Sequence, residues 1–117
     1  MKSTLQNSEH YKWGNNCDSY VLLNNKNLSV KFEKMPPKTT EEKHFHKFSQ
    51  QYFFIINGNV EFEITNSSKE IQKIMVRENE GIHIPSNTEH KILNFSENEI
   101  KFLVISQPST DNDRENV

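Results

Sequence analysis

The chain contains a single cysteine, Cys17, so it cannot form an internal disulfide bond. It also lacks a long apolar run, because the longest one, Tyr52 to Ile56, is far too short to span a bilayer. The first ten residues contain no apolar segment of the kind that a signal peptide requires. These absences argue against a disulfide-rich secreted protein, and we expect a cytoplasmic protein with no membrane partner.

No charge of one sign is in large excess. The sequence has 14 Lys and Arg against 16 Asp and Glu, a formal net charge of -2, and a pI near 6.2. Phosphate binding needs a clustered basic face, so we expect no nucleic-acid partner. Only 32% of the residues are hydrophobic and the mean hydropathy is -0.85, which predicts a thin core for one 117-residue domain. Because an oligomer would bury further surface, we predict a homodimer.

A helical repeat of apolar residues is absent from the middle of the chain. Instead, short stretches rich in β-branched and aromatic residues alternate with turn residues at intervals of about eight to twelve, which is typical of a β-sandwich or barrel. The stretch from Leu28 to Met35 alternates most clearly. Its apolar residues Leu28, Val30 and Phe32 share one face and its polar residues share the other, which predicts a half-buried strand.

The sequence therefore predicts one all-β domain. The expected strands cover residues 18–23, 28–35, 51–56, 60–64, 70–76, 91–95 and 100–106. Asn57-Gly58 predicts a tight hairpin turn. We expect residues 1–12 to form a flexible N-terminal segment, residues 13–108 the barrel domain, and residues 109–117 a polar tail that is ordered only where it packs on a neighbour.

Two histidines at alternate positions precede the strand expected at residues 51–56. Successive side chains of a strand point to opposite faces, so His44 and His46 project together and Phe45 projects the other way. Two imidazoles side by side are a natural pair of metal ligands. If only this pair is considered, the alternative to a metal site is a hydrated strand on the surface.

A second stretch runs from Gly81 to Asn94. A short apolar strand leads into Pro85, and a turn then leads to His90 at the start of another strand. Proline ends a β-ladder, and Asn87 tolerates the left-handed conformation that a tight turn often requires. The stretch thus predicts a third histidine at the head of a strand.

The two stretches together resemble the two signature motifs of the cupin superfamily. The first motif is G-x5-H-x-H-x3,4-E-x6-G, and His44, His46 and Gly58 match it. Gln51 stands at the glutamate position, and Lys38 stands where the leading glycine would be.

The second cupin motif is G-x5-P-x-G-x2-H-x3-N, and Pro85, His90 and Asn94 match it. Asn87 replaces the inner glycine, and Gly81 stands four residues before the proline instead of six. Asn94 would either face the pocket or hold backbone near it.

The resemblance covers roughly Trp13 to Pro108 and implies a single-domain cupin jelly-roll β-barrel of two antiparallel sheets. It also implies a site inside the barrel for one divalent transition metal ion, with Zn, Fe, Ni, Mn and Cu not distinguished. The implied ligands are His44, His46, Gln51 and His90. The alternative is a cupin that has lost its metal and keeps the histidines as donors lining the pocket.

Gln51 is the informative departure from the motif. Its neutral carbonyl oxygen binds a divalent ion less strongly than a glutamate would, so the ion keeps its full positive charge and favours an anionic ligand. Gln50 fits the shorter spacing that the motif allows and is the other candidate for the fourth ligand. Gly58 falls at the expected distance if the ligand is Gln51.

Side-chain parity makes Phe53, Ile92 and Val104 the apolar wall of a pocket for a small-molecule ligand. One hypothesis is a metal-dependent enzyme of the oxygenase or isomerase type that acts on a small anionic metabolite or a sugar. The other is a non-catalytic small-molecule binding or sensor module. Glu89 is the only carboxylate in the two stretches 43–58 and 81–94, so the enzyme hypothesis lacks an obvious general base.

Overall fold

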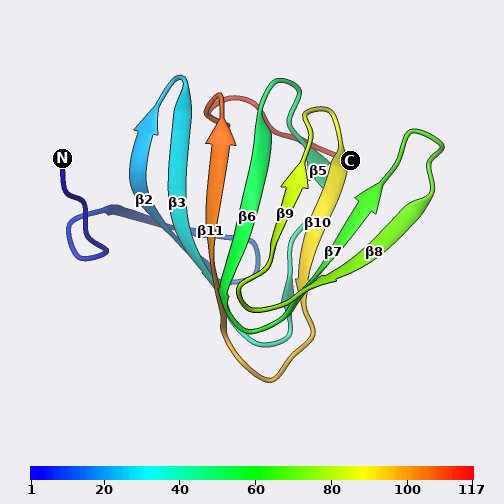
Figure 1. Ribbon diagram of the computed structural model, residues 1–117, viewed down its shortest axis with the longest axis horizontal. Helices are drawn as coiled ribbons and strands as arrows, with labels where there is room; N and C mark the ends of the chain where they lie inside the picture. The colour runs from blue at the N-terminus through cyan, green and yellow to red at the C-terminus, as the bar shows by residue number, and fades with distance from the viewer.

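A computed structural model describes all residues, 1–117, and consists of two antiparallel β-sheets without a helix (Figure 1). The first sheet has the order β1-β2-β3-β11-β6-β9. Its strands are β1 (Glu9–Trp13), β2 (Cys17–Asn25), β3 (Leu28–Met35), β6 (Gln50–Asn57), β9 (Gly81–Ile84) and β11 (Ile100–Gln107).

The second sheet has the order β12-β5-β10-β7-β8, and β4 also pairs with β10. Its strands are β4 (Thr39–Thr40), β5 (His44–Phe45), β7 (Val60–Thr65), β8 (Ile71–Val76), β10 (Glu89–Asn94) and β12 (Glu115–Asn116). Figure 1 shows the strands of the two sheets converging at one end of the molecule. This architecture confirms the predicted all-β jelly roll.

The barrel interior changes from apolar to polar along its strands. On β11 and β6 the inward pairs run from Phe102 and Ile55 to Val104 and Phe53, and then to Ser106 and Gln51. Residues opposite one another on antiparallel strands point to the same face, so each pair forms one layer of the interior. The apolar layers form the core, and the polar layer of Ser106 and Gln51 lines a cavity.

The inward face of strand β3 is mostly polar. Ser29, Glu33 and Met35 are buried, whereas Val30 and Phe32 lie on the outer face and are only partly buried. The alternation expected from the sequence is present, but the apolar face does not point to the barrel interior. It belongs instead to an apolar surface on the outside of the first sheet.

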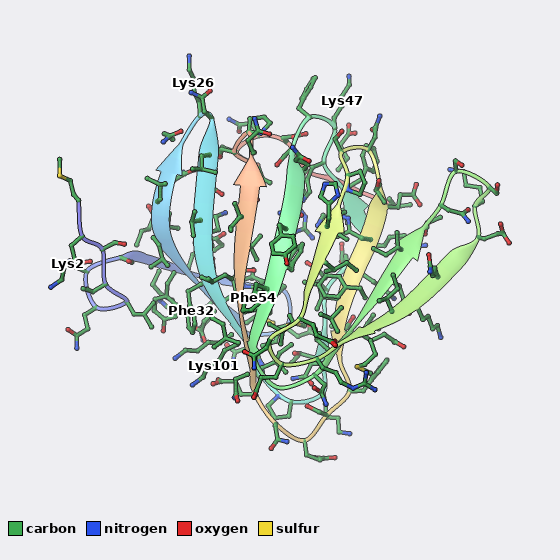
Figure 2. All side chains as sticks on the ribbon, in the orientation of Figure 1. Lys2, Lys26, Phe32, Lys47, Phe54 and Lys101 are labelled. Carbon is green, nitrogen blue, oxygen red and sulfur yellow. The ribbon has the colours of Figure 1, made fainter.

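That outer surface is built from rows of registered side chains. One row runs from Tyr20 through Phe32 and Leu103 to Phe54, because these residues pair in sequence across β2, β3, β11 and β6. Phe32 and Phe54 lie on the strands that flank β11 (Figure 2). The apolar residues of this thin-cored chain are therefore divided between its interior and one outer sheet face.

The predicted hairpin at Asn57-Gly58 is wrong. The strands on either side of it, β6 and β7, belong to different sheets, so the turn carries the chain from one sheet to the other. Gly58 has a φ of 93°, and a Cβ atom there would lie 2.6 Å from Ile100 Cγ2. The chain does turn at Gly58, as the sequence predicted, but a residue with positive φ does not fix which strands pair.

Both ends of the chain pair with the sheets. Strand β1 begins at Glu9, ahead of the expected boundary at Trp13, and β12 pairs with β5 at the other end of the chain. The division into a flexible segment, a barrel domain and a polar tail stays a prediction. No helix in the structure is long and apolar enough to cross a membrane.

Candidate metal centre

The three motif histidines meet inside the barrel. His44 on β5 pairs with His90 on β10, and His46 follows β5 by one residue. The centroids of the imidazole rings lie 4.4 Å apart for His44 and His90, and 5.0 Å apart for His44 and His46. All three residues are buried, and one ligand atom from each lies within 4.8 Å of the others. This spacing suits three ligands of one ion.

Backbone carbonyl groups set the tautomer of each histidine. The Nδ1 atoms of the three rings lie near carbonyl oxygens of Glu42 (2.9 Å, His44), Asp113 (2.5 Å, His46) and Thr88 (2.8 Å, His90). A carbonyl oxygen only accepts hydrogen bonds, so Nδ1 carries the proton and Nε2 of the neutral ring keeps its lone pair. The Nε2 atoms of His46 and His90 are buried without a hydrogen-bond partner.

Burial keeps these histidines neutral. It lowers the pKa of His44 to about 3 and that of His90 to about 4, and it also lowers the pKa of His46. Neighbouring histidines add to the effect at His44 and His90 because two imidazolium charges would repel each other. At neutral pH the cluster therefore offers uncharged imidazoles, which is the form that binds a metal.

The structure distinguishes the two candidate glutamines by position. Gln51 is buried, and its Nε2 donates to Ser106 Oγ at 3.1 Å, which leaves its Oε1 buried without a partner. Gln50 is exposed and accepts a hydrogen bond from His83 Nε2 at 2.9 Å. Three imidazole nitrogens and an amide oxygen fit a divalent transition metal ion, although the ligand role of Gln51 stays a prediction.

A cavity of about 240 Å³ opens beside the cluster. Phe53, Ile92 and Val104 line it together with His44, His46 and Gln51. The role of the three apolar residues in binding a ligand stays a prediction. His90 lies behind the lining, against His44. The remaining wall is polar or aromatic and comprises Tyr11, Trp13, Lys31, Glu33, Glu41, Ser106, Thr110 and Arg114. The cavity is thus more polar than the sequence suggested.

Two buried carboxyl groups in this wall were missed by sequence reasoning. Glu33 comes from the inward polar face of β3, and burial raises its pKa to about 7. Glu41 lies 3.9 Å from His44 Nδ1 and accepts a hydrogen bond from the Ile92 N–H at 3.2 Å. Burial raises the pKa of Glu41 to about 8. Polar and apolar residues alternate along β3, and this pattern would have identified Glu33 if the polar face had been assigned to the interior.

Residues that replace motif glycines keep the backbone conformation that a glycine would provide. Lys38 and Asn87 have φ values of 59° and 63°, both in the left-handed region. The Asn87 N–H donates to the His46 carbonyl oxygen at 2.7 Å, which ties the two motif stretches together. Asn94 holds backbone, because its Nδ2 donates to the carbonyl oxygens of Met35, Pro36 and Asn98.

The fold and the histidine cluster define a small β-barrel protein with a candidate metal centre in its interior. The sequence profile of the family described as "Cupin domain" matches residues 31–106, which is more than half of the chain. The protein therefore belongs to the cupin domain family, as its motifs predicted. No curated protein matches the sequence.

Solved structures of several cupin-like proteins resemble this one. KdgF from Halomonas sp. shares 13% identity at a TM-score of 0.81, and the match covers 96% of this chain and 98% of that one. A variant of Streptomyces PAC13 with uridine shares 15% identity at a TM-score of 0.81, over 99% and 89% of the two chains. Oxalate decarboxylase from Bacillus subtilis shares 20% identity at a TM-score of 0.82, but this chain spans only 32% of its length. These similarities establish the fold.

Proposed function

We propose that this protein is a metal-dependent enzyme of the isomerase type that acts on a small hydroxylated molecule such as a sugar. Its single divalent transition metal ion would be held by His44, His46, His90 and Gln51. The observation that carries this proposal is the set of buried acceptors without partners, Nε2 of His46 and His90 and Oε1 of Gln51. Buried polar atoms are nearly always satisfied, and a metal ion would satisfy all of these together.

The metal ion, when bound, would act as a Lewis acid that polarises a carbonyl or hydroxyl oxygen of the substrate. Isomerisation also needs a group that removes a proton from carbon and returns it. We assign this role to Glu33, which is buried in the cavity wall and whose pKa, raised to about 7 by burial, suits proton transfer near neutral pH. Glu41 is less suited to this role, because it already accepts a hydrogen bond from the Ile92 N–H and lies 3.9 Å from His44 Nδ1.

The cavity wall offers many hydrogen-bonding partners to a hydroxylated ligand. Glu33 and Glu41 can exchange hydrogen bonds with hydroxyl groups, and Lys31 and Arg114 in the same wall can donate to hydroxyl oxygens. Trp13 and Tyr11 add aromatic surface for a sugar ring. The similar PAC13 structure was solved with uridine, a neutral hydroxylated molecule. Of the two substrate classes expected from the sequence, we therefore propose the sugar.

Metal content and proton exchange test the proposal together. Untagged protein purified without chelator should carry about one equivalent of a transition metal per chain, and His46→Ala should lose most of it. In D2O, the loaded protein should catalyse deuterium incorporation into a reactive aldose or ketose from a panel, measured by NMR. Glu33→Gln should abolish this exchange while keeping the metal, and Glu99→Gln, an exposed control, should retain both.

The competing function is a non-catalytic small-molecule binding or sensor module. Gln51 favours it, because a neutral ligand at the glutamate position binds the ion less strongly and supplies no base. Metal-loaded protein that binds sugars but exchanges no deuterium would support this module. Protein that takes up no added metal would overturn the metal-dependent enzyme and leave a pocket that binds organic ligands through its histidines.

We also propose that the protein is a cytoplasmic homodimer. The apolar row of Tyr20, Phe32, Leu103 and Phe54 covers the outer face of the first sheet, and a second copy would remove it from water. In a two-fold dimer the same surface of each copy would meet, so this row would serve as the interface on both.

A further inference from the structure

Residues 113–117, which we call the clamp segment, lie along residues 41–49, the stretch that carries two of the three histidines. Strand β12 of the clamp segment pairs with β5, so that Asn116 stands opposite His44. Asn116 Nδ2 also donates to the carboxylate of Glu42 at 3.2 Å. In Figure 1 the C-terminal residues run beside β5. The clamp segment thus contacts the metal-centre stretch through both backbone and side chains.

Asp113 is the anchor of the clamp segment. Its carboxylate accepts hydrogen bonds from three consecutive backbone N–H groups, those of Lys47 (2.7 Å), Phe48 (3.1 Å) and Ser49 (2.9 Å). Burial alone would raise the pKa of Asp113, but the three donors outweigh it and hold the pKa below its ordinary value. Charge-assisted bonds of this kind are about twice as strong as neutral ones, so Asp113 fixes the loop that follows the histidine pair.

The same residue orients His46. The backbone carbonyl of Asp113 accepts the hydrogen bond from His46 Nδ1–H, although the two residues are 67 positions apart. The other two rings are held by carbonyl groups only two positions away, in Glu42 and Thr88. His46 is therefore the histidine of the cluster whose tautomer depends on a distant segment of the chain.

The clamp segment also lies beyond residue 106, where the match to the cupin domain profile ends. We propose that Asp113 is a positioning residue for the metal centre, which acts by holding the loop at residues 47–49 and the ring of His46. This inference rests on the proposed metal site for its effect on affinity. Its effect on the His46 tautomer is independent of any metal.

The first test measures metal affinity in Asp113→Ala. Zn²⁺ binding to the full chain, measured by competition with a chromogenic chelator, should weaken about 10- to 100-fold, as is typical when a group that orients a ligand is lost. Asp111→Ala is the matched control, because Asp111 is exposed, carries the same charge and bonds instead to Asn24 at 3.0 Å. The control should bind Zn²⁺ as tightly as the wild type. Wild-type affinity in Asp113→Ala would overturn the proposal.

The second test observes the histidine rings of metal-free protein by long-range ¹H–¹⁵N NMR. In the wild type, all three rings should carry the proton on Nδ1. In Asp113→Ala, His46 should become a mixture of tautomers, whereas His90, held by Thr88, should not change. A merely structural role would disturb both rings alike, and an unchanged His46 would refute the proposed role of Asp113.

A third variant guards against misfolding. Asp113→Asn keeps one acceptor oxygen, so it should fold even if Asp113→Ala does not, and should show an intermediate loss of Zn²⁺ affinity. If the wild type binds no Zn²⁺, the proposed function fails. The tautomer of His46 in Asp113→Asn and in the wild type then still decides whether Asp113 positions the ring.

Discussion

Replacing the buried carboxyl group of Glu33 with an amide should stabilise the metal-free protein far more at pH 8 than at pH 5. Glu33 is 9% exposed, and burial raises its pKa from an ordinary 4.5 to about 7, with Ser19, Lys31 and Arg114 offsetting only part of that effect. In the unfolded chain the group titrates near its ordinary value. Between the two pKa values, the folded protein therefore holds a proton that the unfolded protein releases.

The sign and size of the effect follow from this difference. A raised pKa in the folded state means that the free energy of unfolding falls as the pH rises from about 4.5 through 7, and stays low above that. At about 1.4 kcal/mol per pKa unit, the loss at pH 8 has an upper limit of roughly 3 kcal/mol. Glu33→Gln removes the ionisation and should recover up to this amount at pH 8 but less than about 1 kcal/mol at pH 5.

Urea unfolding of chelator-treated protein at the two pH values would measure the effect. The lowered pKa values of His44 and His90 destabilise the folded state below about pH 6.5, but they do so in wild type and variant alike and cancel in the comparison. Glu99→Gln, at an exposed site, should show no gain at either pH. If the advantage of Glu33→Gln over the wild type were no larger at pH 8 than at pH 5, the assignment of Glu33 as a costly buried carboxylate would be wrong.

Three further outcomes are expected. Gln51→Glu supplies an anionic oxygen and should tighten Zn²⁺ binding about tenfold in chelator competition, whereas an unchanged affinity would remove Gln51 from the ligand set. Gly58→Ala should lower the free energy of unfolding by about 1–3 kcal/mol in urea, because φ is 93° and the new Cβ would meet Ile100 Cγ2 at 2.6 Å. Phe54→Lys should convert the proposed dimer to a monomer in sedimentation experiments, and a wild-type monomer at micromolar concentration would refute the dimer.

The histidine cluster could be predicted because its determinants are short-range. The spacing of His44 and His46 requires only the two-residue repeat of a strand, and the turn at Asn87 requires only a residue that accepts positive φ. That the two stretches lie together in space was inferred from their resemblance to the cupin motifs. The same local rules predicted the turn at Gly58 but not the strands it joins, since pairing depends on the whole sheet.

The clamp segment and the inward carboxyl groups escaped prediction for different reasons. Residues 109–117 are polar and have no repeat, and nothing local to Asp113 indicates that it bonds to a loop more than sixty positions earlier. Glu33 was hidden by the usual assumption that the apolar face of a strand points to the core. In β3 that assumption fails, because the outer face of the first sheet is itself apolar.

The two carboxyl groups in the cavity wall strengthen the case for chemistry rather than simple packing. Burying Glu33 costs up to roughly 3 kcal/mol at neutral to alkaline pH, and Glu41 has its pKa raised still further, to about 8, by burial. A chain with only 32% hydrophobic residues is expected to be marginally stable. Apolar residues at these two positions would avoid the free-energy cost of burying a carboxyl group. Perturbed carboxyl groups beside a cavity and a candidate metal centre are an arrangement that selection for stability alone would disfavour and that is typical of functional sites.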